Sequence, residues 1–102
     1  MIHRSLQKYL PQMISLFKKH KVKNAYVFGS AVTGNFNEKS DVDFLVNLNE
    51  GLDPVDAGEH LWDLADELEE LLNRKIDLLT ERSLKNPFFI KELSETKVVI
   101  YG

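Results

Sequence analysis

Two carboxylates separated by one residue are the first feature of the sequence that could do chemistry. Asp41 and Asp43 stand at the start of an apolar run that continues to Leu48. In a strand, residues i and i+2 point to the same face, so both carboxylates would lie on one side, about 7 Å apart at the backbone. Like charges at that spacing repel unless a cation lies between them, and Mg²⁺ prefers oxygen ligands of this kind. The pair therefore predicts a metal site, although the solvated face of an edge strand would look the same.

A third carboxylate, Asp77, stands alone in the apolar run from Ile76 to Leu79. By itself it is equally consistent with an outward-facing residue of an edge strand. If its strand lies beside residues 41–48, however, three carboxylates share one face of the sheet. Such a group is typical of a two-metal site, whose ions lie about 3.5–4 Å apart.

The turn after the first predicted strand could hold a phosphate. Residues 24–28 are apolar enough for a short buried strand, and Gly29-Ser30 follows directly. Glycine lets the backbone approach a phosphate closely, and free amides at a following helical turn would receive its negative charge. The Ser30 hydroxyl would add a donor. A Gly-Ser pair alone is weak evidence, since many strand-to-turn corners contain one.

The surrounding segments must position these residues. Apolar residues at spacings of three and four predict an amphipathic helix over residues 6–17, in which Pro11 either starts the main helix or kinks it. Further strands are predicted over residues 41–48, 75–79 and 97–101. Asp53-Pro54 and Asn86-Pro87 each place a capping side chain before a proline, which predicts two helix starts. The order predicts a mixed α/β (α+β) fold, with helices packed on one small mixed β-sheet, as a single domain over residues 1–102.

Composition bounds the class of protein. The chain has 102 residues, of which 43% are apolar and 28% charged, and these ordinary values exclude a collagen, a coiled coil or a disordered chain. Because cysteine is absent, a disulfide framework and a thiolate metal site are excluded. The apolar runs are too short to span a bilayer, and the N-terminus does not resemble a secretory signal. We therefore expect a cytoplasmic protein without membrane contact.

The net charge of −3 conceals an asymmetry. Residues 1–37 contain six Lys or Arg and no Asp or Glu, whereas residues 38–102 contain seven Lys or Arg and all sixteen acids. One interpretation is a basic first helix packed beside an acidic later one, and the other is a basic half that meets an anionic ligand. The lack of carboxylates around Gly29-Ser30 favours the second interpretation there, because a triphosphate would not be repelled. The basic stretch from Lys18 to Lys23 leaves both open.

These residues together form a compound pattern. It consists of Gly29-Ser30, then Gly34, then Ser40-Asp41-Val42-Asp43 followed by three apolar residues, with the lone Asp77 further on. The pattern resembles the polymerase-beta-like nucleotidyltransferase superfamily, and the short chain resembles its minimal form (MNT), the small nucleotidyltransferase domain proteins of prokaryotes. The resemblance covers the chain from about residue 25 to residue 79, and the ending from residue 97 to residue 102 is also similar.

The resemblance implies roles for these residues. Gly29 and Ser30 would bind the triphosphate of ATP, Asp41 and Asp43 would bind two Mg²⁺ ions, and Asp77 would complete the catalytic metal site and help to deprotonate the attacking hydroxyl. The implied reaction is Mg²⁺-dependent transfer of AMP to a hydroxyl, with a tyrosine of a cognate HEPN-domain toxin as the expected acceptor, in a type VII-like toxin–antitoxin pair. A homo- or hetero-oligomer is compatible with this role. Direct nucleic-acid binding is not expected, because the second half is acidic and carries no groove-reading motif.

One departure from the family pattern leaves alternatives open. Many relatives carry an arginine between the two glycines, whereas residues 31–33 are Ala-Val-Thr here. Lys39, Arg74 or Arg82 would have to supply the missing charge. Without catalysis, the chain would be an antitoxin that neutralises its partner by contact alone. A further alternative is a nucleotidyltransferase that acts on a small molecule such as an aminoglycoside.

The remaining histidines and aromatic residues receive no role. His3, His20 and His60 lie outside the pattern and are predicted to be surface or helix-face residues. Five aromatic side chains are predicted to pack in the core and not to stack on a nucleobase: Trp62, Phe17, Phe44, Phe88 and Phe89.

Overall fold

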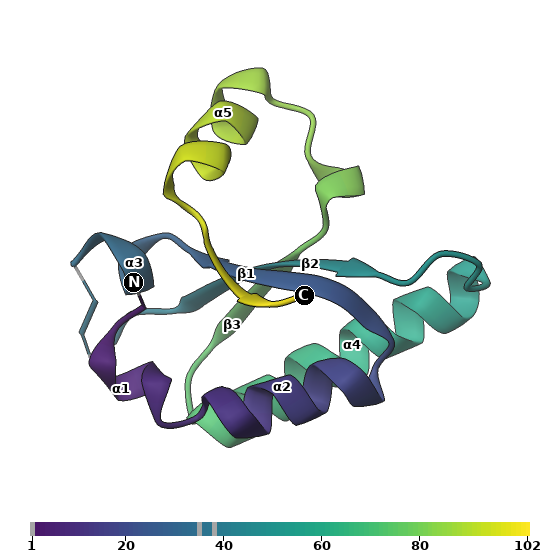
Figure 1. Ribbon diagram of the computed structural model, residues 1–102, viewed down its shortest axis with the longest axis horizontal. Helices are drawn as coiled ribbons and strands as arrows, with labels where there is room; N and C mark the ends of the chain where they lie inside the picture. The colour runs from purple at the N-terminus through teal and green to yellow at the C-terminus, as the bar shows by residue number, and fades with distance from the viewer. Residues whose placement is uncertain (1, 35, 38) are drawn as a thin grey trace.

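A four-stranded mixed sheet forms the centre of the computed structural model, which describes residues 2–34, 36–37 and 39–102 (Figure 1). Asn35 and Glu38 of the predicted loop therefore lie outside the described residues. The elements in chain order are α1 (Arg4–Gln7), α2 (Leu10–Lys19), β1 (Val22–Phe28), α3 (Ser30–Thr33), β2 (Val42–Leu48), α4 (Pro54–Leu72), β3 (Ile76–Leu79), a 3-10 turn (Glu81–Ser83), α5 (Pro87–Thr96) and β4 (Val98–Tyr101).

The sheet has the strand order β3-β2-β1-β4. β1 pairs antiparallel with both β2 and β4, whereas β2 and β3 are parallel. Parallel neighbours need a long crossover connection, and α4 provides it between β2 and β3. The predicted mixed α/β fold is thereby confirmed. Within the described ranges, no helix combines the length and the apolar character needed to cross a membrane.

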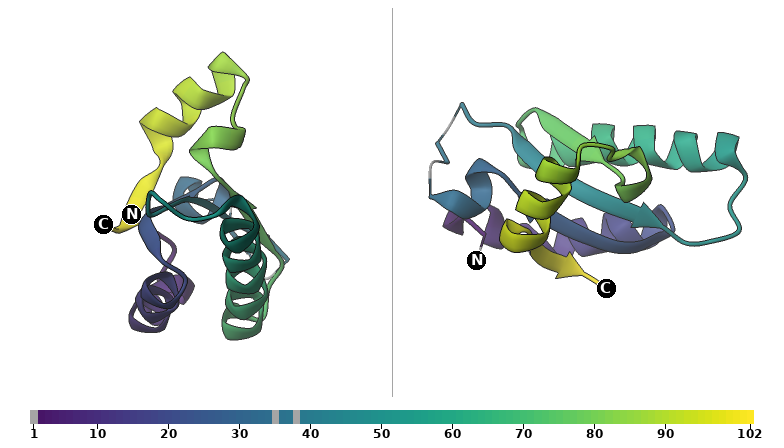
Figure 2. Two further views of the ribbon diagram at one scale, coloured as in Figure 1. Left: turned by 90° about the vertical axis from the view of Figure 1, so that its right-hand side faces the viewer. Right: turned by 90° about the horizontal axis from the view of Figure 1, so that it is seen from above.

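Helices cover the two faces of the sheet unequally. α2 and α4 run side by side on one face, and α5 lies alone on the other (Figures 1 and 2). The predicted alternation along β2 is confirmed, because Val42, Phe44 and Val46 are buried together in the main core. On the opposite face, Leu45 packs in a smaller cluster with Leu93 of α5. The β2 strand is thus buried from both sides over its central residues.

Local capping explains where the helices begin. The Asp53 and Asn86 side chains accept hydrogen bonds from the amides two residues further on, at 3.0 and 2.9 Å, and a proline occupies the first turn of each helix. Pro11 lies in the first turn of α2 and follows the separate helix α1, so it starts the main helix. β1 begins at Val22, two residues earlier than predicted.

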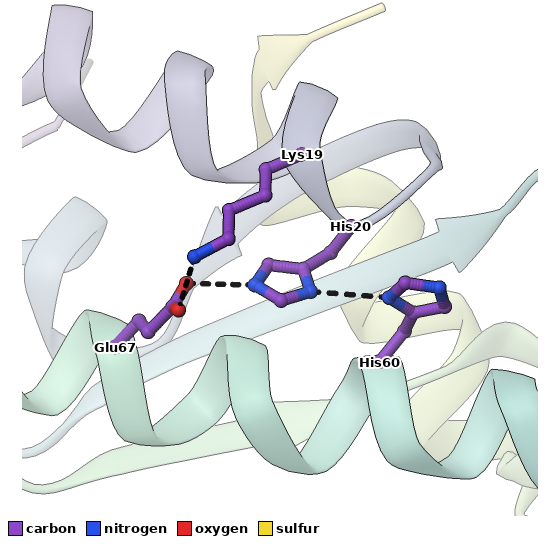
Figure 3. Close-up of polar contacts among 4 residues, drawn as sticks. All are labelled: Lys19, His20, His60 and Glu67. Carbon is purple, nitrogen blue, oxygen red and sulfur yellow. Dashed lines mark hydrogen bonds and ion pairs between the residues drawn. The ribbon is translucent and has the colours of Figure 1, made fainter.

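His20 is a correction to the prediction of a surface or helix-face residue, because it is only 4% exposed. It lies between α2 and α4, where its Nε2–H donates to Glu67 Oε2 at 2.7 Å and its Nδ1 lies 3.2 Å from Nδ1 of His60 (Figure 3). Lys19 Nζ contacts the other oxygen of Glu67 at 2.6 Å. These contacts fasten the end of α2 to α4, so His20 is a structural residue of the helix pair.

The aromatic residues divide into two groups. Phe17 and Phe44 are buried as predicted, and Phe89 packs edge to face on Phe28 at 6.2 Å between ring centroids. Trp62 and Phe88 are 73% and 83% exposed, so the prediction that they pack in the core is wrong. Neither belongs to the buried positions of its helix, which are Leu64, Leu68 and Leu72 in α4 and Leu93 in α5.

Candidate active site

The parallel pairing of β2 with β3 brings the candidate carboxylates to one edge of the fold. Asp43 and Asp77 are register partners across the two strands, so the adjacency on which the prediction for Asp77 depended is present. Asp41 lies just before β2 and not inside it. Asp43 is half-buried, and Asp41 and Asp77 are exposed. Alternate residues of a strand point to the same face, so Asp43 lies on the same face of the sheet as Leu45. This is the face that carries α5.

The electrostatics of this edge penalise free carboxylates. Burial raises the pKa of the Asp43 carboxyl above its ordinary value, and the negative charges of Asp77 and then Asp41 raise it further. Both causes act against the ionised form. A cation among the three side chains would remove the repulsion, so the edge favours a positively charged ligand.

Gly29 places the predicted phosphate turn directly against Asp43. Its backbone has φ 73° and ψ −148°, a region that is essentially restricted to glycine. A Cβ atom at this position would overlap Oδ2 of Asp43. The turn therefore needs glycine both for its conformation and for the close approach. No acid precedes residue 38 in the sequence, so the turn is expected to be free of carboxylates. The fold brings the Asp43 carboxylate against Gly29, so this expectation is wrong.

Ser30 begins α3, the single helical turn that follows Gly29. The Val32 amide donates to the Gly29 carbonyl at 3.1 Å and closes this turn. The first amides of a helix have no partner inside the helix, and here they follow a glycine that contacts the carboxylate edge. The arrangement can present backbone donors to an anion beside Asp43, so the triphosphate role of Gly29 and Ser30 stays a prediction that this geometry allows.

An arginine holds the loop that leads into Asp41. Arg74 Nη1 donates to the carbonyls of Asn37 at 2.7 Å and of Ser40 at 3.1 Å. Of the three cations that could replace the family arginine, Arg74 is thus engaged with this loop and Lys39 is exposed on it. Arg82 lies at the opposite end of the sheet, where it lines a cavity of about 700 Å³. Among the residues that the structure describes, none of the candidate site residues lines that cavity. The candidate site is therefore identified by its carboxylates and its glycine turn and not by a cavity.

The ligand atoms that the three carboxylates offer are of the type that a divalent cation binds. Asp41, Asp43 and Asp77 offer oxygen ligands only, which suits Mg²⁺. Among the described residues, no three His, Cys, Asp or Glu side chains already converge into a metal-binding arrangement. The carboxylates thus share an edge without forming a closed ligand sphere, and a bound ion would need further oxygen ligands, such as phosphate or water.

Comparison with known proteins agrees with this geometry. Residues 11–102 match the family model of the polymerase beta nucleotidyltransferase domain. An inferred protein adenylyltransferase of Methanocaldococcus jannaschii is 37% identical over 82 residues, which cover 80% of each chain. Among solved structures, a toxin–antitoxin crystal structure with AMP-PNP has a TM-score of 0.71 and 25% identity, over 91% of this chain and 73% of that one. An inferred minimal nucleotidyltransferase has a TM-score of 0.70 and 28% identity, over 96% and 95% of the two chains.

Proposed function

The chain belongs to the polymerase beta nucleotidyltransferase family, and we propose that it is a protein adenylyltransferase that moves AMP from Mg-ATP to a hydroxyl group of a partner protein. One observation carries the proposal: the glycine turn lies against Asp43, which is in register with Asp77. A phosphate-binding turn and a group of carboxylates therefore meet at one edge of the sheet. The M. jannaschii relative, named as an inferred protein adenylyltransferase, supports a protein as acceptor.

The reaction assigns a task to each part of the edge. Gly29 and Ser30 would bind the triphosphate, and Asp41, Asp43 and Asp77 would hold two divalent cations. When bound, these ions would lower the pKa of the attacking hydroxyl and neutralise the leaving pyrophosphate. The hydroxyl oxygen forms a bond to the α-phosphorus while the bond from that phosphorus to the α–β bridging oxygen breaks, and pyrophosphate departs. Asp77, which is exposed, is the residue to which the family resemblance assigns the hydroxyl proton.

The proposed acceptor is a tyrosine of a HEPN-domain toxin, for which this chain acts as antitoxin. Two findings support this choice of partner. The sequence resembles the minimal nucleotidyltransferases that act beside such toxins, and the solved structure with AMP-PNP is a toxin–antitoxin assembly. Addition of AMP to the tyrosine would place a bulky anion on the toxin and so block its activity.

Intact-mass spectrometry of a cognate HEPN-domain toxin, co-purified with this chain, tests the proposal. After incubation with Mg-ATP, the partner should gain the mass of AMP, and the Asp41→Ala/Asp43→Ala double variant should abolish the gain. The matched control is Asp63→Ala/Asp66→Ala, which removes two exposed carboxylates from α4 and should leave labelling unchanged. Equal labelling by the site variant would refute the catalytic assignment.

The same experiment separates the two alternative functions. If the unlabelled double variant still neutralises the toxin at one-to-one stoichiometry, the chain is an antitoxin that acts by contact. If a small hydroxylated molecule gains AMP while the partner does not, the acceptor is not a protein.

A further inference from the structure

Arg74 connects the two segments that carry the candidate carboxylates. It lies between α4 and β3, three residues before Asp77. Its guanidinium reaches across to the loop before β2, where one nitrogen, Nη1, donates to two backbone carbonyls at 2.7 and 3.1 Å. The second of these carbonyls belongs to Ser40, the residue that immediately precedes Asp41.

The same guanidinium also lies on an aromatic ring. The Arg74 Cζ atom is 4.2 Å from the centroid of Phe36, which is itself only 8% exposed. A planar guanidinium can stack on a ring and donate hydrogen bonds in its own plane at the same time. Phe36 therefore fixes the plane of the arginine, and the arginine fixes the peptide groups around Asp41.

A third contact extends this connection along the backbone. The Val42 amide donates to the Lys75 carbonyl at 3.0 Å, one step before the register pair of Asp43 and Asp77. Arg74 thus extends the contact between the two segments to the residues that precede the first residues of β2 and β3. Without Arg74, the Ser40 carbonyl next to Asp41 would lose its hydrogen bond to the segment that carries Asp77.

We propose that Arg74 is a positioning residue of the active site, which sets the place of the Asp41 carboxylate relative to Asp43 and Asp77 by holding the Ser40 carbonyl. It acts through the loop, because Nη1 donates to two backbone carbonyls that precede Asp41. The inference rests on the proposed function for its catalytic consequence. Its structural consequence, a fixed Asp41, is independent of any partner protein.

Arg74→Lys is the most informative variant, because it keeps the positive charge but loses the planar fork and the stacking. Partners that orient metal ligands typically change metal affinity or activity by about 10–100-fold when they are replaced. We therefore expect Arg74→Lys to raise the Mg²⁺ concentration for half-maximal AMP transfer by about tenfold or more, with a smaller change in the KM for ATP. Arg82→Lys, at the cavity end of the sheet, is the matched control and should behave as wild type.

Two measurements do not depend on transfer to a partner. Mn²⁺ binding to the isolated chain in the presence of AMP-PNP, followed by electron paramagnetic resonance, should weaken in Arg74→Lys and not in Arg82→Lys. Hydrogen exchange at the Val42 amide should accelerate in Arg74→Lys below the melting transition. These two results would support the role of Arg74 even if no AMP transfer were found, in which case the proposed function alone fails.

Wild-type Mn²⁺ affinity and wild-type Mg²⁺ dependence in Arg74→Lys would overturn the inference. A lower melting temperature with unchanged metal affinity in the folded variant would also overturn it, since Arg74 would then only stabilise the fold.

Discussion

Replacement of Gly29 by alanine should damage the candidate site more than the fold. The glycine has φ 73° and ψ −148°, in a region where other residues are strained by about 1–3 kcal/mol. For a domain of this size, each kcal/mol lowers the Tm by about 4–8 °C. The added Cβ would overlap Oδ2 of Asp43, so the carboxylate must rotate away. Because a displacement of about 1 Å in a reacting geometry can cost about 100-fold in rate, we expect a loss of transfer of that order in the folded variant.

Gly34 provides the matched control for this prediction. It also has a positive φ, of 89°, so alanine there is strained by roughly 1–2 kcal/mol. Among the described residues other than its chain neighbours, none has an atom within 4 Å of the position its Cβ would take. Gly34→Ala should therefore lose stability without losing the rate of AMP transfer. Calorimetry gives the Tm of each variant, and transfer is then measured well below both transitions. Equal rates for the two folded variants would refute the claim that Gly29 sets the place of Asp43.

Three further outcomes follow from other contacts. Glu67→Ala leaves Nε2–H of the buried His20 without its acceptor. Urea denaturation should therefore show that the free energy of unfolding falls by about 1–3 kcal/mol. Glu67→Gln can still accept this hydrogen bond, so its free energy of unfolding should fall by less than about half of that amount. Hydrogen bonds from Lys19 and then His20 lower the pKa of Glu67 from its ordinary value of 4.5. The ionised Glu67 therefore contributes fully to the free energy of unfolding above pH 4.5, and this contribution is lost as the pH falls through the lower pKa of the folded state. The stability difference between wild type and Glu67→Gln should therefore shrink in acid, and a constant difference would contradict the assignment. Chelation of divalent cations should stop AMP transfer but lower the Tm only slightly, because Asp41 and Asp77 are exposed at the edge of the sheet and a ligand of the native state stabilises it in proportion to its binding; a large drop in Tm by calorimetry would show a structural metal instead.

Much of the fold could be predicted from local chemistry. Asp53 and Asn86 act within two residues of their own position, so the sequence suffices to place both helix starts. The alternation of Val42, Phe44 and Val46 is also local, because the period of a strand decides which residues share a face. Pro11 was ambiguous, since only the separation of α1 from α2 shows that it starts a helix.

The parts that could not be predicted depend on which segments meet. Asp77 joins the site only because β3 pairs parallel with β2, and no residue within β3 specifies that neighbour. His20 is buried because α4 packs over the end of α2, where Glu67 and His60 contact it. The role of Arg74 could not be predicted either, because its partners are backbone carbonyls 37 and 34 residues away. Every residue has a backbone carbonyl, so the sequence does not indicate which of them an arginine will contact.

The position of Asp43 also decides how the charge asymmetry should be understood. At the end of α2, Lys19 pairs with Glu67 of α4, so the interpretation of a basic helix beside an acidic one applies there. At the turn, Asp43 Oδ2 lies directly against Gly29, so a triphosphate bound to that turn would meet a carboxylate at once. Two anions in contact repel unless a cation lies between them, and oxygen ligands of both kinds suit a divalent ion. The turn and the carboxylate can therefore serve one nucleotide only if they share a cation, which is why we expect chelation to abolish transfer and not merely to weaken it.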